Sequence, residues 1–396
     1  MGKEIELSTA ITDIAAGPFG SNLKVECFVP SGFPIIDGAN LKGYKVTDNI
    51  TKFVTEEKAR SLSRSIAHRG DVIVTISGTI GQIAYIPEDS LYDEYLCSQR
   101  QFRVSFDSSM VYVPYLVFYF HTFEGQNKIL SFANQTGVPA LSQPLKNFKK
   151  IRLCLPSLQE QRRIASIVET INDKIENNIK INDNLQQQAF SVFDNLIANA
   201  ENNDYTVSDY AFLNPKRTLA KNQVARSIDM SQLSTSGAFP SGWEMKPFNG
   251  GMRFTNGDTL FARITPCLEN GKTAFIDFLD DGEVAFGSTE YIVLAPKNDT
   301  PPEMLYCLAR YPAFVDYAVK NMNGSSGRQR VSAETVGQYR LPLFDKHSLV
   351  LFKEVVSPMF LMMRYNSLEN MRLAELRDAL LPKLMSGEID VSAVQL

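Results

Sequence analysis

The segment Asn323-Gly324-Ser325-Ser326-Gly327-Arg328-Gln329-Arg330 concentrates side chains that can hydrogen bond to the edges of nucleic-acid bases. An arginine can donate two hydrogen bonds to guanine, and a glutamine can bond to adenine through both of its amide atoms. The segment combines two arginines and a glutamine with glycines and has no apolar residue, which is typical of a surface loop. We predict that this loop contacts DNA.

Other polar residues on predicted loops and strand ends form a wider set of candidates for DNA contact. In the first half of the chain they are Ser21, Asn22, Lys24, Ser77, Thr79, Gln99, Arg100, Asn134 and Gln135. In the second half they are Arg253, Thr255, Asn256, Arg263, Thr265, Thr289, Glu290, Ser325, Ser326, Arg328, Gln329 and Arg330. For each residue outside the loop at 323–332, stabilising a turn or facing solvent explains the residue type equally well.

The motifs of a DNA-modifying enzyme do not occur in the sequence. A phosphate-binding G-x-x-x-x-G-K-[S/T] loop is approached only at Gly271-Lys272-Thr273, where Pro266 replaces the required first glycine. The three histidines are dispersed, which argues against a metal cluster or a catalytic triad. We therefore predict a chain without catalytic residues and without a bound metal or cofactor.

Composition indicates an ordinary globular protein of more than one domain. The chain has 396 residues, of which 44% are hydrophobic and 21% are charged. Its five cysteines lack the spacing of a disulfide framework or a zinc site, so we expect buried thiols in a reducing compartment. The first residues lack the apolar core of a signal peptide, and we expect a cytoplasmic protein. The net charge of −4 predicts only modest non-specific affinity of the free chain for DNA.

An internal repeat organises the chain. Arg69-Gly70-Asp71 and Asn256-Gly257-Asp258 each precede a predicted strand, a loop and a second strand. Gly81 and Gly271 differ by 190 positions, and the same offset relates Ser98 to Ser288 and Ser142 to Ser332. Each half then reaches a Leu-Pro pair and becomes helical. The sequence therefore predicts two α/β (α+β) domains of the same fold but of unlike surface.

Each half ends in a helix with apolar residues at alternating steps of four and three, which is a coiled-coil seam. The first seam is Ile164, Val168, Ile171, Ile175, Asn178, Asn182, Leu185, Ala189, Val192 and Leu196. The second is Phe352, Val356, Met359, Met363, Asn366, Asn370, Leu373, Arg377, Leu380 and Leu384. A core-facing helix is the ordinary explanation of one such stripe, but here both seams carry two consecutive asparagine layers.

Because a buried asparagine lowers stability and fixes register, these layers indicate that the two helices pair with each other. The residues expected to fix the register are Asn178, Asn182, Asn366 and Asn370. We expect an antiparallel pair, because the domain between the helices must return the chain, whereas the pattern alone also permits a parallel pair. At 1.5 Å per residue the first helix is about 60 Å long, which suits a spacer and not a core element. The predicted segments are a first domain at 1–156, a helix at 157–200, a second domain at 201–342 and a helix at 343–396.

Pro358 interrupts the second seam, so we predict a kink there or a helix that begins at about that residue. Pro382 lies in the expected last turn, and Ser386-Gly387 supplies the stop.

Three segments resemble the specificity subunits of type I restriction-modification enzymes. The run from Leu155 to Ala165, LPSLQEQRRIA, is similar to the central conserved region of that family. The run from Leu376 to Ile389, LRDALLPKLMSGEI, is similar to the distal conserved region, and Gly17-Pro18-Phe19-Gly20-Ser21-Asn22-Leu23-Lys24 resembles the start of many first recognition domains. Together with the repeat, the resemblance extends over essentially the whole chain.

The resemblance implies a non-catalytic subunit that reads a bipartite target in double-stranded DNA, one half-site with each domain. It also implies that the helices dock two methyltransferase subunits, which methylate adenine with S-adenosylmethionine, and that ATP-dependent restriction subunits join that core. S-adenosylmethionine, ATP and Mg are then expected on the partner subunits. The second half has Phe344-Asp345-Lys346-His347 where the first half has the family-like run from Ser157 to Gln161. This difference leaves open whether the two helices dock their partners equally strongly.

Two alternatives remain open from the residues. The chain could serve a fused restriction-methylation enzyme outside type I, or it could be a structural adaptor that does not bind DNA. A purified complex without sequence preference for DNA would favour the adaptor.

Overall fold

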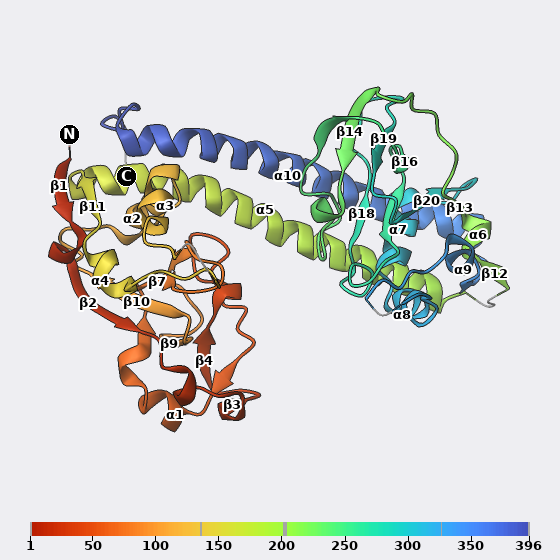
Figure 1. Ribbon diagram of the computed structural model, residues 1–396. Coiled ribbons are helices and arrows are strands. Elements are labelled where there is room, and N and C mark those ends of the chain that lie inside the picture. Colours follow the sequence, from red (N-terminus) through yellow and green to blue (C-terminus); the bar gives the residue numbers. More distant parts are fainter. Residues whose placement is uncertain (1, 135–136, 201–203, 326, 395–396) are drawn as a thin grey trace. The chain divides into compact units, whose positions relative to one another are not determined.

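The computed structural model describes residues 2–134, 137–200, 204–325 and 327–394. Along the chain, two sheet-rich domains alternate with two long helices, α5 (Leu158–Ala198) and α10 (Lys346–Ser386), as predicted (Figure 1). The chain divides into two compact units. The first unit comprises Met1–Ile171 and Glu375–Leu396, and the second comprises Asn172–Ala374, so that each unit contains part of both helices.

The first unit is built on three sheets. An antiparallel four-stranded sheet has the order β2 (Ile11–Ala16), β10 (Gln101–Phe106), β7 (Val72–Thr75) and β8 (Ile83–Tyr85). A five-stranded sheet has the order β3 (Phe28–Val29), β5 (Phe53–Val54), β4 (Phe33–Ile36), β9 (Glu94–Cys97) and β6 (Ile66–His68). Strand β1 (Lys3–Glu6) pairs with β11 (Arg152–Leu155). The short helices are α1 (Glu56–Arg60), α2 (Val113–Phe120), α3 (Phe123–Leu130) and α4 (Pro144–Lys149).

The second unit repeats this plan. One sheet has the order β13 (Ala211–Leu213), β20 (Tyr291–Pro296), β17 (Thr259–Ala262) and β18 (Thr273–Phe275). The other has the order β15 (Glu244–Pro247), β14 (Val224–Ile228), β19 (Ala285–Gly287) and β16 (Met252–Phe254). Strand β12 (Tyr205–Thr206) pairs with β21 (Arg340–Leu341). The short helices are α6 (Val207–Tyr210), α7 (Pro302–Arg310), α8 (Pro312–Lys320) and α9 (Ala333–Gly337).

The two units share most of their strand topology, and the sheet that contains β4 has one edge strand more, β3, than the sheet that contains β14. β7 lies between β10 and β8, as β17 lies between β20 and β18. The parallel pair β4 and β9, with β6 antiparallel to β9, corresponds to the parallel pair β14 and β19, with β16 antiparallel to β19. Every residue of β7 and β17 is buried, because these strands lie inside the sheets and are covered on both faces. The sequence repeat is thus a duplication of the fold.

The helices α5 and α10 pair in antiparallel fashion within each unit, which confirms the prediction (Figure 1). In the second unit, Asn178 Nδ2 donates to Asn370 Oδ1 at 2.8 Å, and Asn366 Nδ2 donates to Asn182 Oδ1 at 2.8 Å. The later asparagine of α5 therefore meets the earlier one of α10. Lys174 adds an ion pair with Glu369 at 3.1 Å beside these layers.

The helices are also core elements, so the expectation that they act only as a spacer was wrong. Ile164, Val168 and Leu384 belong to the hydrophobic core of the first unit. Phe193 and Phe352, with ring centroids 6.3 Å apart, belong to the core of the second unit. The apolar seam therefore completes the cores that the sheets leave open on one face.

Gln161 shows how the start of α5 is fixed to the first domain. Its side chain is fully buried, donates to the carbonyl oxygens of Met110 and Pro156 at 3.0 Å each, and accepts from the Tyr112 N–H at 2.8 Å. Ser157 and Glu160 form a capping pair just ahead of it, with 2.9 Å from the Ser157 N–H to Glu160 Oε2. The run similar to a conserved family region therefore has a local structural role.

Helix α10 begins at Lys346 and continues without a break past Pro358, so a helix start at Pro358 was a wrong expectation. Pro358 and Glu354 are both exposed, and water can bond the Glu354 carbonyl that the proline leaves without an N–H partner. The helix ends at Ser386, and Gly387 has φ +78°, as the predicted stop requires. Of the five free cysteines only Cys97 and Cys307 are buried. The prediction of buried thiols is therefore confirmed for these two and wrong for the other three.

None of the helices in the described part of the chain combines the length and apolar character needed to cross a lipid bilayer.

Replacing Asn182 with alanine is expected to lower the free energy of unfolding by about 1–3 kcal/mol, because the buried amide of Asn366 loses its acceptor. Chemical denaturation, followed by the circular-dichroism signal of the helices, measures this change in the free energy of unfolding. The exposed Lys180→Ala on the same helix is the control. Replacing both Asn182 and Asn366 with leucine should restore stability, and a double variant as unstable as Asn182→Ala would contradict the role given to this layer.

Candidate nucleic-acid interface

In the first unit, the antiparallel pairing of β7 with β10 brings four predicted residues to one end of the sheet. Ser77 and Thr79 follow β7, while Gln99 and Arg100 precede β10. The Ile76 N–H donates to the Arg100 carbonyl at 2.7 Å, which joins the two loops. All four candidates line a cavity of about 580 Å³, here called the first groove.

The glycine-framed N-terminal loop forms one wall of the first groove. Leu23 and Val25 line the groove, and Ser21, Asn22 and Lys24 beside them are exposed. The Gly17 N–H donates to the Gln101 carbonyl at 2.7 Å, and a Cβ on Gly17 would lie 1.9 Å from the Ser98 carbonyl oxygen. Only glycine permits this close approach, which holds the loop against the start of β10.

Residues 137–141 lie beside the same sheet end. The Gly78 N–H donates to the Pro139 carbonyl at 2.9 Å, and Ser77 forms an isolated β-bridge with Ala140. Asn134 is exposed and donates from its backbone N–H to the Ala140 carbonyl at 2.8 Å. Gln135 lies outside the described residues. The structure thus gathers the described candidates of the first half around one groove.

Gln101 is a groove residue that the sequence did not reveal as a candidate. It is fully buried, and its Oε1 accepts from the Ser98 N–H at 3.3 Å and the Ser98 hydroxyl at 3.1 Å. Its Nε2 has no hydrogen-bond partner in the described part of the chain. Gln82 also lines the groove and donates to the Gly38 carbonyl at 3.1 Å. The signal available was a glutamine at the first position of a strand, followed directly by the apolar Phe102.

The second unit places its candidates at the equivalent strand ends, here called the second reading edge. Arg263 follows β17, and Glu290 precedes β20. The Arg263 N–H donates to the Glu290 carbonyl at 3.0 Å, and the Thr265 N–H donates to the Gln329 carbonyl at 3.1 Å. The predicted loop at 323–332 therefore lies at this edge, where Ser325, Arg328 and Thr289 are exposed, while Ser326 lies outside the described residues.

Glu290 and Arg330 form an ion pair at the second reading edge, with 2.7 Å between Arg330 Nη2 and Glu290 Oε1. Hydrogen bonds from Arg330 lower the pKa of the Glu290 carboxyl, so the pair remains ionised at neutral pH. Arg263 Nε lies 4.0 Å from Glu290 Oε2. At the position equivalent to Glu290, 190 residues earlier, the first groove has Arg100. The two edges thus share a backbone layout and differ in charge.

Three candidates of the second half lie apart from the loop at 323–332. Thr255 and Asn256 precede β17 and so lie at the end opposite Arg263, about 13 Å away for a four-residue strand. The amide of Asn256 bonds to both backbone groups of Leu279, at 2.8 and 2.9 Å, and so stabilises a turn. Arg253 lies on β16, and its guanidinium covers the Phe248 ring at 5.7 Å.

No group of three or more His, Cys, Asp or Glu side chains suited to hold a metal occurs among the described residues. The His121 Nε2–H donates to the Ile83 carbonyl oxygen at 2.8 Å, and burial lowers the pKa of this imidazole.

Comparisons with known proteins agree on one family. Residues 29–187 match the model of the type I restriction modification DNA specificity domain. The chain is 22% identical to the specificity subunit of the type I restriction enzyme HindI from Haemophilus influenzae, over 78% of this chain and 84% of that protein. It is 21% identical to the MjaIX specificity subunit from Methanocaldococcus jannaschii, over 96% of this chain and 92% of that protein.

A solved structure supports the same fold. The S subunit of a type I restriction-modification system from M. genitalium superposes with a TM-score of 0.59 at 14% identity, over 96% of this chain and 95% of that one.

Asp258, in the turn that precedes β17, makes the stability of the second unit depend on pH. Asp258 is buried and accepts from Arg217 Nη2 at 2.7 Å and from the Thr255 N–H at 2.7 Å. Burial raises its pKa from 3.8 to about 6 and outweighs the opposing effect of these bonds. The folded state therefore binds this proton more tightly than the unfolded state. The contribution of Asp258 to stability is fully present below pH 4 and is lost as pH rises through about 6.

The contribution amounts to up to about 3 kcal/mol, at 1.36 kcal/mol per pKa unit. Urea unfolding of wild type and Asp258→Asn across this pH range measures it as the difference between the two slopes. Identical slopes would show that Asp258 does not titrate as described.

Proposed function

Because the chain belongs to the family of type I restriction-modification specificity subunits, we propose that it reads a bipartite DNA target with one half-site per sheet-rich domain. The observation that carries the proposal is the duplicated fold with unlike polar residues at matching strand ends. The first groove gathers Ser77, Thr79, Gln99 and Arg100 between β7 and β10. The second reading edge brings Arg263 and Glu290, which lie between β17 and β20 in the chain, together with Arg328 from the loop at 323–332.

Unlike side chains at equivalent places favour unlike half-sites. Arg100 is exposed and can donate to a guanine, whereas Glu290 at the equivalent position is an acceptor already bonded to Arg330. Each edge also carries hydroxyl groups and amides for bonds to phosphates or other bases. Two identical domains would read a symmetric target, whereas these domains favour an asymmetric one.

Exposed arginines at the two edges give matched tests. Arg100→Ala should relax one base position in one half-site, and Arg328→Ala one position in the other, each at a cost of about 1–3 kcal/mol if the residue reads a base. An arginine that contacts phosphate would instead weaken binding to all sequences alike. Methylation of a random-sequence DNA library by the assembled complex measures both effects.

Lys320→Ala is the control, because Lys320 is exposed on α8 and pairs only locally, with Asp316 at 2.6 Å. A wild-type complex without sequence preference would contradict the proposed function and favour a structural adaptor.

We also propose that the long helices dock the methylating subunits. On α10, the side chains of Leu351, Val355, Met362 and Tyr365 are 47 to 55% exposed. Their spacing of four, seven and three places them on one side of the helix, apart from the buried seam. Exposed apolar residues in such a row are typical of a protein interface. This row is here called the α10 apolar stripe.

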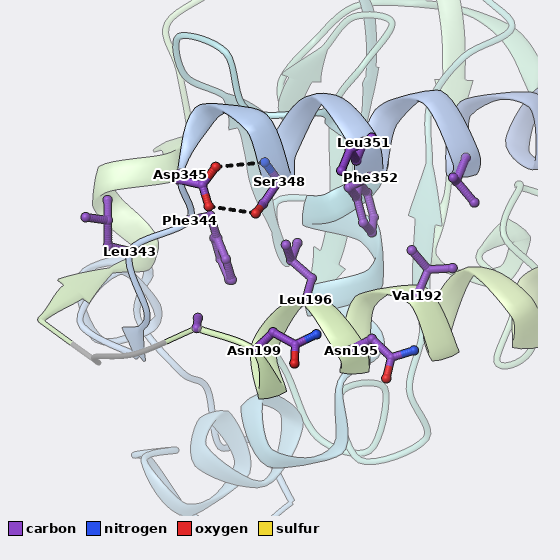
Figure 2. Close-up of a pocket in the computed structure, with 12 residues that line it drawn as sticks. Val192, Asn195, Leu196, Asn199, Leu343, Phe344, Asp345, Ser348, Leu351 and Phe352 are labelled. Atoms are coloured by element: carbon purple, nitrogen blue, oxygen red, sulfur yellow. Dashed lines mark hydrogen bonds between the residues drawn. The ribbon is translucent and has the colours of Figure 1, made fainter.

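A pocket of about 250 Å³ adjoins the stripe. Leu351 and Val355 line it from α10, and Val192 and Leu196 line it from α5 (Figure 2). Asp345 caps the start of α10 beside it, with 2.9 Å to the Ser348 N–H. Such a pocket suits an apolar side chain of a partner helix packed along the stripe.

The equivalent row on α5, 188 residues earlier, is polar at three of its four positions, and Val355 corresponds to the apolar Ile167. Leu351 corresponds to Arg163, Met362 to Lys174, and Tyr365 to Asn177. Two copies of a methylating subunit would therefore meet unlike helix faces. We assign S-adenosylmethionine to these partners, and ATP and Mg to the restriction subunits, because the groove residues of this chain suit DNA.

Replacing Leu351 and Met362 together with glutamate should remove one copy of the methylating subunit from the complex, because apolar contacts would be replaced by desolvated charges. Native mass spectrometry of the complex measures the copy number. Lys353→Glu, an exposed change on the same helix, is the control and should leave the copy number unchanged. Full assembly of the double variant would contradict docking on the α10 apolar stripe.

A further inference from the structure

The loop at 323–331 is held at its base by backbone hydrogen bonds. Asn323 and Arg330 exchange N–H···O bonds of 2.9 Å in both directions. The Gln329 N–H also donates to Thr265 Oγ1 at 3.1 Å, and the Arg328 N–H donates to the Ser325 carbonyl at 3.0 Å. The base of the loop is thus joined, through Thr265, to the segment that follows β17.

Arg330 uses all three nitrogens of its guanidinium within the second unit. Nε lies 3.0 and 2.9 Å from the two carboxylate oxygens of Glu290, and Nη2 lies 2.7 Å from Oε1. Nη1 donates to the Arg328 carbonyl at 3.2 Å. One side chain therefore connects the strand end at Glu290 to the backbone of the residue two positions earlier in the loop.

Arg328 differs from Arg330 in this respect. Its side chain is exposed and makes no hydrogen bond or ion pair with the described residues. Its backbone is fixed at both polar atoms, by the Ser325 carbonyl and by Arg330 Nη1. The guanidinium of Arg328 is thus free, while the guanidinium of Arg330 holds the Arg328 backbone.

We propose that Glu290 and Arg330 form a positioning clamp that presents Arg328 to a base of the second half-site. The inference rests on the proposed function and assigns different tasks to the two arginines of this loop. Arg328 touches DNA, whereas Arg330 acts through it. Because Glu290 neutralises Arg330, the pair contributes little net attraction to phosphates, and the free charge at the loop is that of Arg328.

The clamp belongs to the second domain alone. In the first groove, Arg100 stands at the position of Glu290, and Ala140 stands at the position of Arg330. Ala140 keeps the backbone bridge, to Ser77, just as Arg330 forms its bridge to Ile264. The repeat therefore preserves the backbone contact in both domains and adds the side-chain clamp where the loop carries a free arginine at its tip.

Preorganisation explains why such a clamp matters for reading. An arginine on a loose loop must be ordered when it binds, and that lost freedom reduces the preference for the correct base. A guanidinium whose backbone is already fixed reads a guanine edge with two bonds of defined direction. Loosening the clamp should thus reduce discrimination at the base that Arg328 reads, and leave other positions unchanged.

The test compares Arg328→Ala, Arg330→Ala and the double variant in the assembled complex, by methylation of a random-sequence DNA library. Arg328→Ala should reduce the preference at one position roughly tenfold or more. Arg330→Ala should reduce the preference at that same position. The double variant should match Arg328→Ala to within about twofold, because the clamp acts only through Arg328.

Two further variants separate positioning from charge. Glu290→Gln keeps one acceptor and should give a smaller loss at the same position than Arg330→Ala. Arg330→Lys keeps the charge but cannot bond both to Glu290 and to the Arg328 carbonyl, and should retain only part of the preference. Unchanged preference in the half-site read by the first domain, and an unchanged melting temperature, show that each variant is folded. Lys320→Ala is again the control.

Several outcomes would overturn the clamp. The first is that Arg330→Ala loses base preference at a different position from Arg328→Ala. The second is that the losses of the two single variants multiply in the double variant. The third is that either single variant keeps the full base preference. Failure of the proposed function itself has another signature, since the wild-type complex would then show no sequence preference at all.

Discussion

The apolar seam between α5 and α10 is the interaction on which each sheet-rich unit depends. Ile164 and Leu384 complete the core of the first unit, and Phe193, Phe352 and Phe360 complete that of the second. A sheet covered on one face only would expose apolar surface, so each domain needs the helix pair to close its core. The asparagine layers cost stability within this seam but restrict the helices to one register. Helix pairing and domain folding are thus one process.

The duplicated topology then decides where recognition residues meet. Because β10 and β20 run antiparallel to β7 and β17, the loop after one strand lies beside the loop before its neighbour. Residues about 25 positions apart in the sequence, such as Arg263 and Glu290, come within ion-pair distance. The same frame supports a cavity rich in amides in one unit and a charged edge in the other. The candidate recognition residues therefore lie in the loops, and the repeat supplies the geometry of these loops.

Several expectations failed for identifiable physical reasons. Pro358 does not start a helix, since its position is exposed and its neighbours Val356 and Phe360 are buried in the core of the second unit. Asn256 has an amide that suits base contact, yet it lies in the turn before β17, where its side chain bonds to the backbone of Leu279. Gln101 was passed over because a glutamine at a strand start resembles any surface residue. Its burial became visible only when the groove was assembled.

The sequence by itself determined the repeat, the two long helices and the asparagine layers, because heptad spacing and offsets of 190 and 188 residues are local properties of the chain. The pattern alone also permitted a parallel pair, and the bonds between Asn178 and Asn370 and between Asn366 and Asn182 decided that the helices are antiparallel. The sequence also identified the loop with two arginines. Only the tertiary structure decided that one of them, Arg330, is bonded to Glu290 and that Arg328 is free. Which polar residues meet depends on strand order and on contacts across 40 residues of chain, and residue types do not encode these until the sheets have formed.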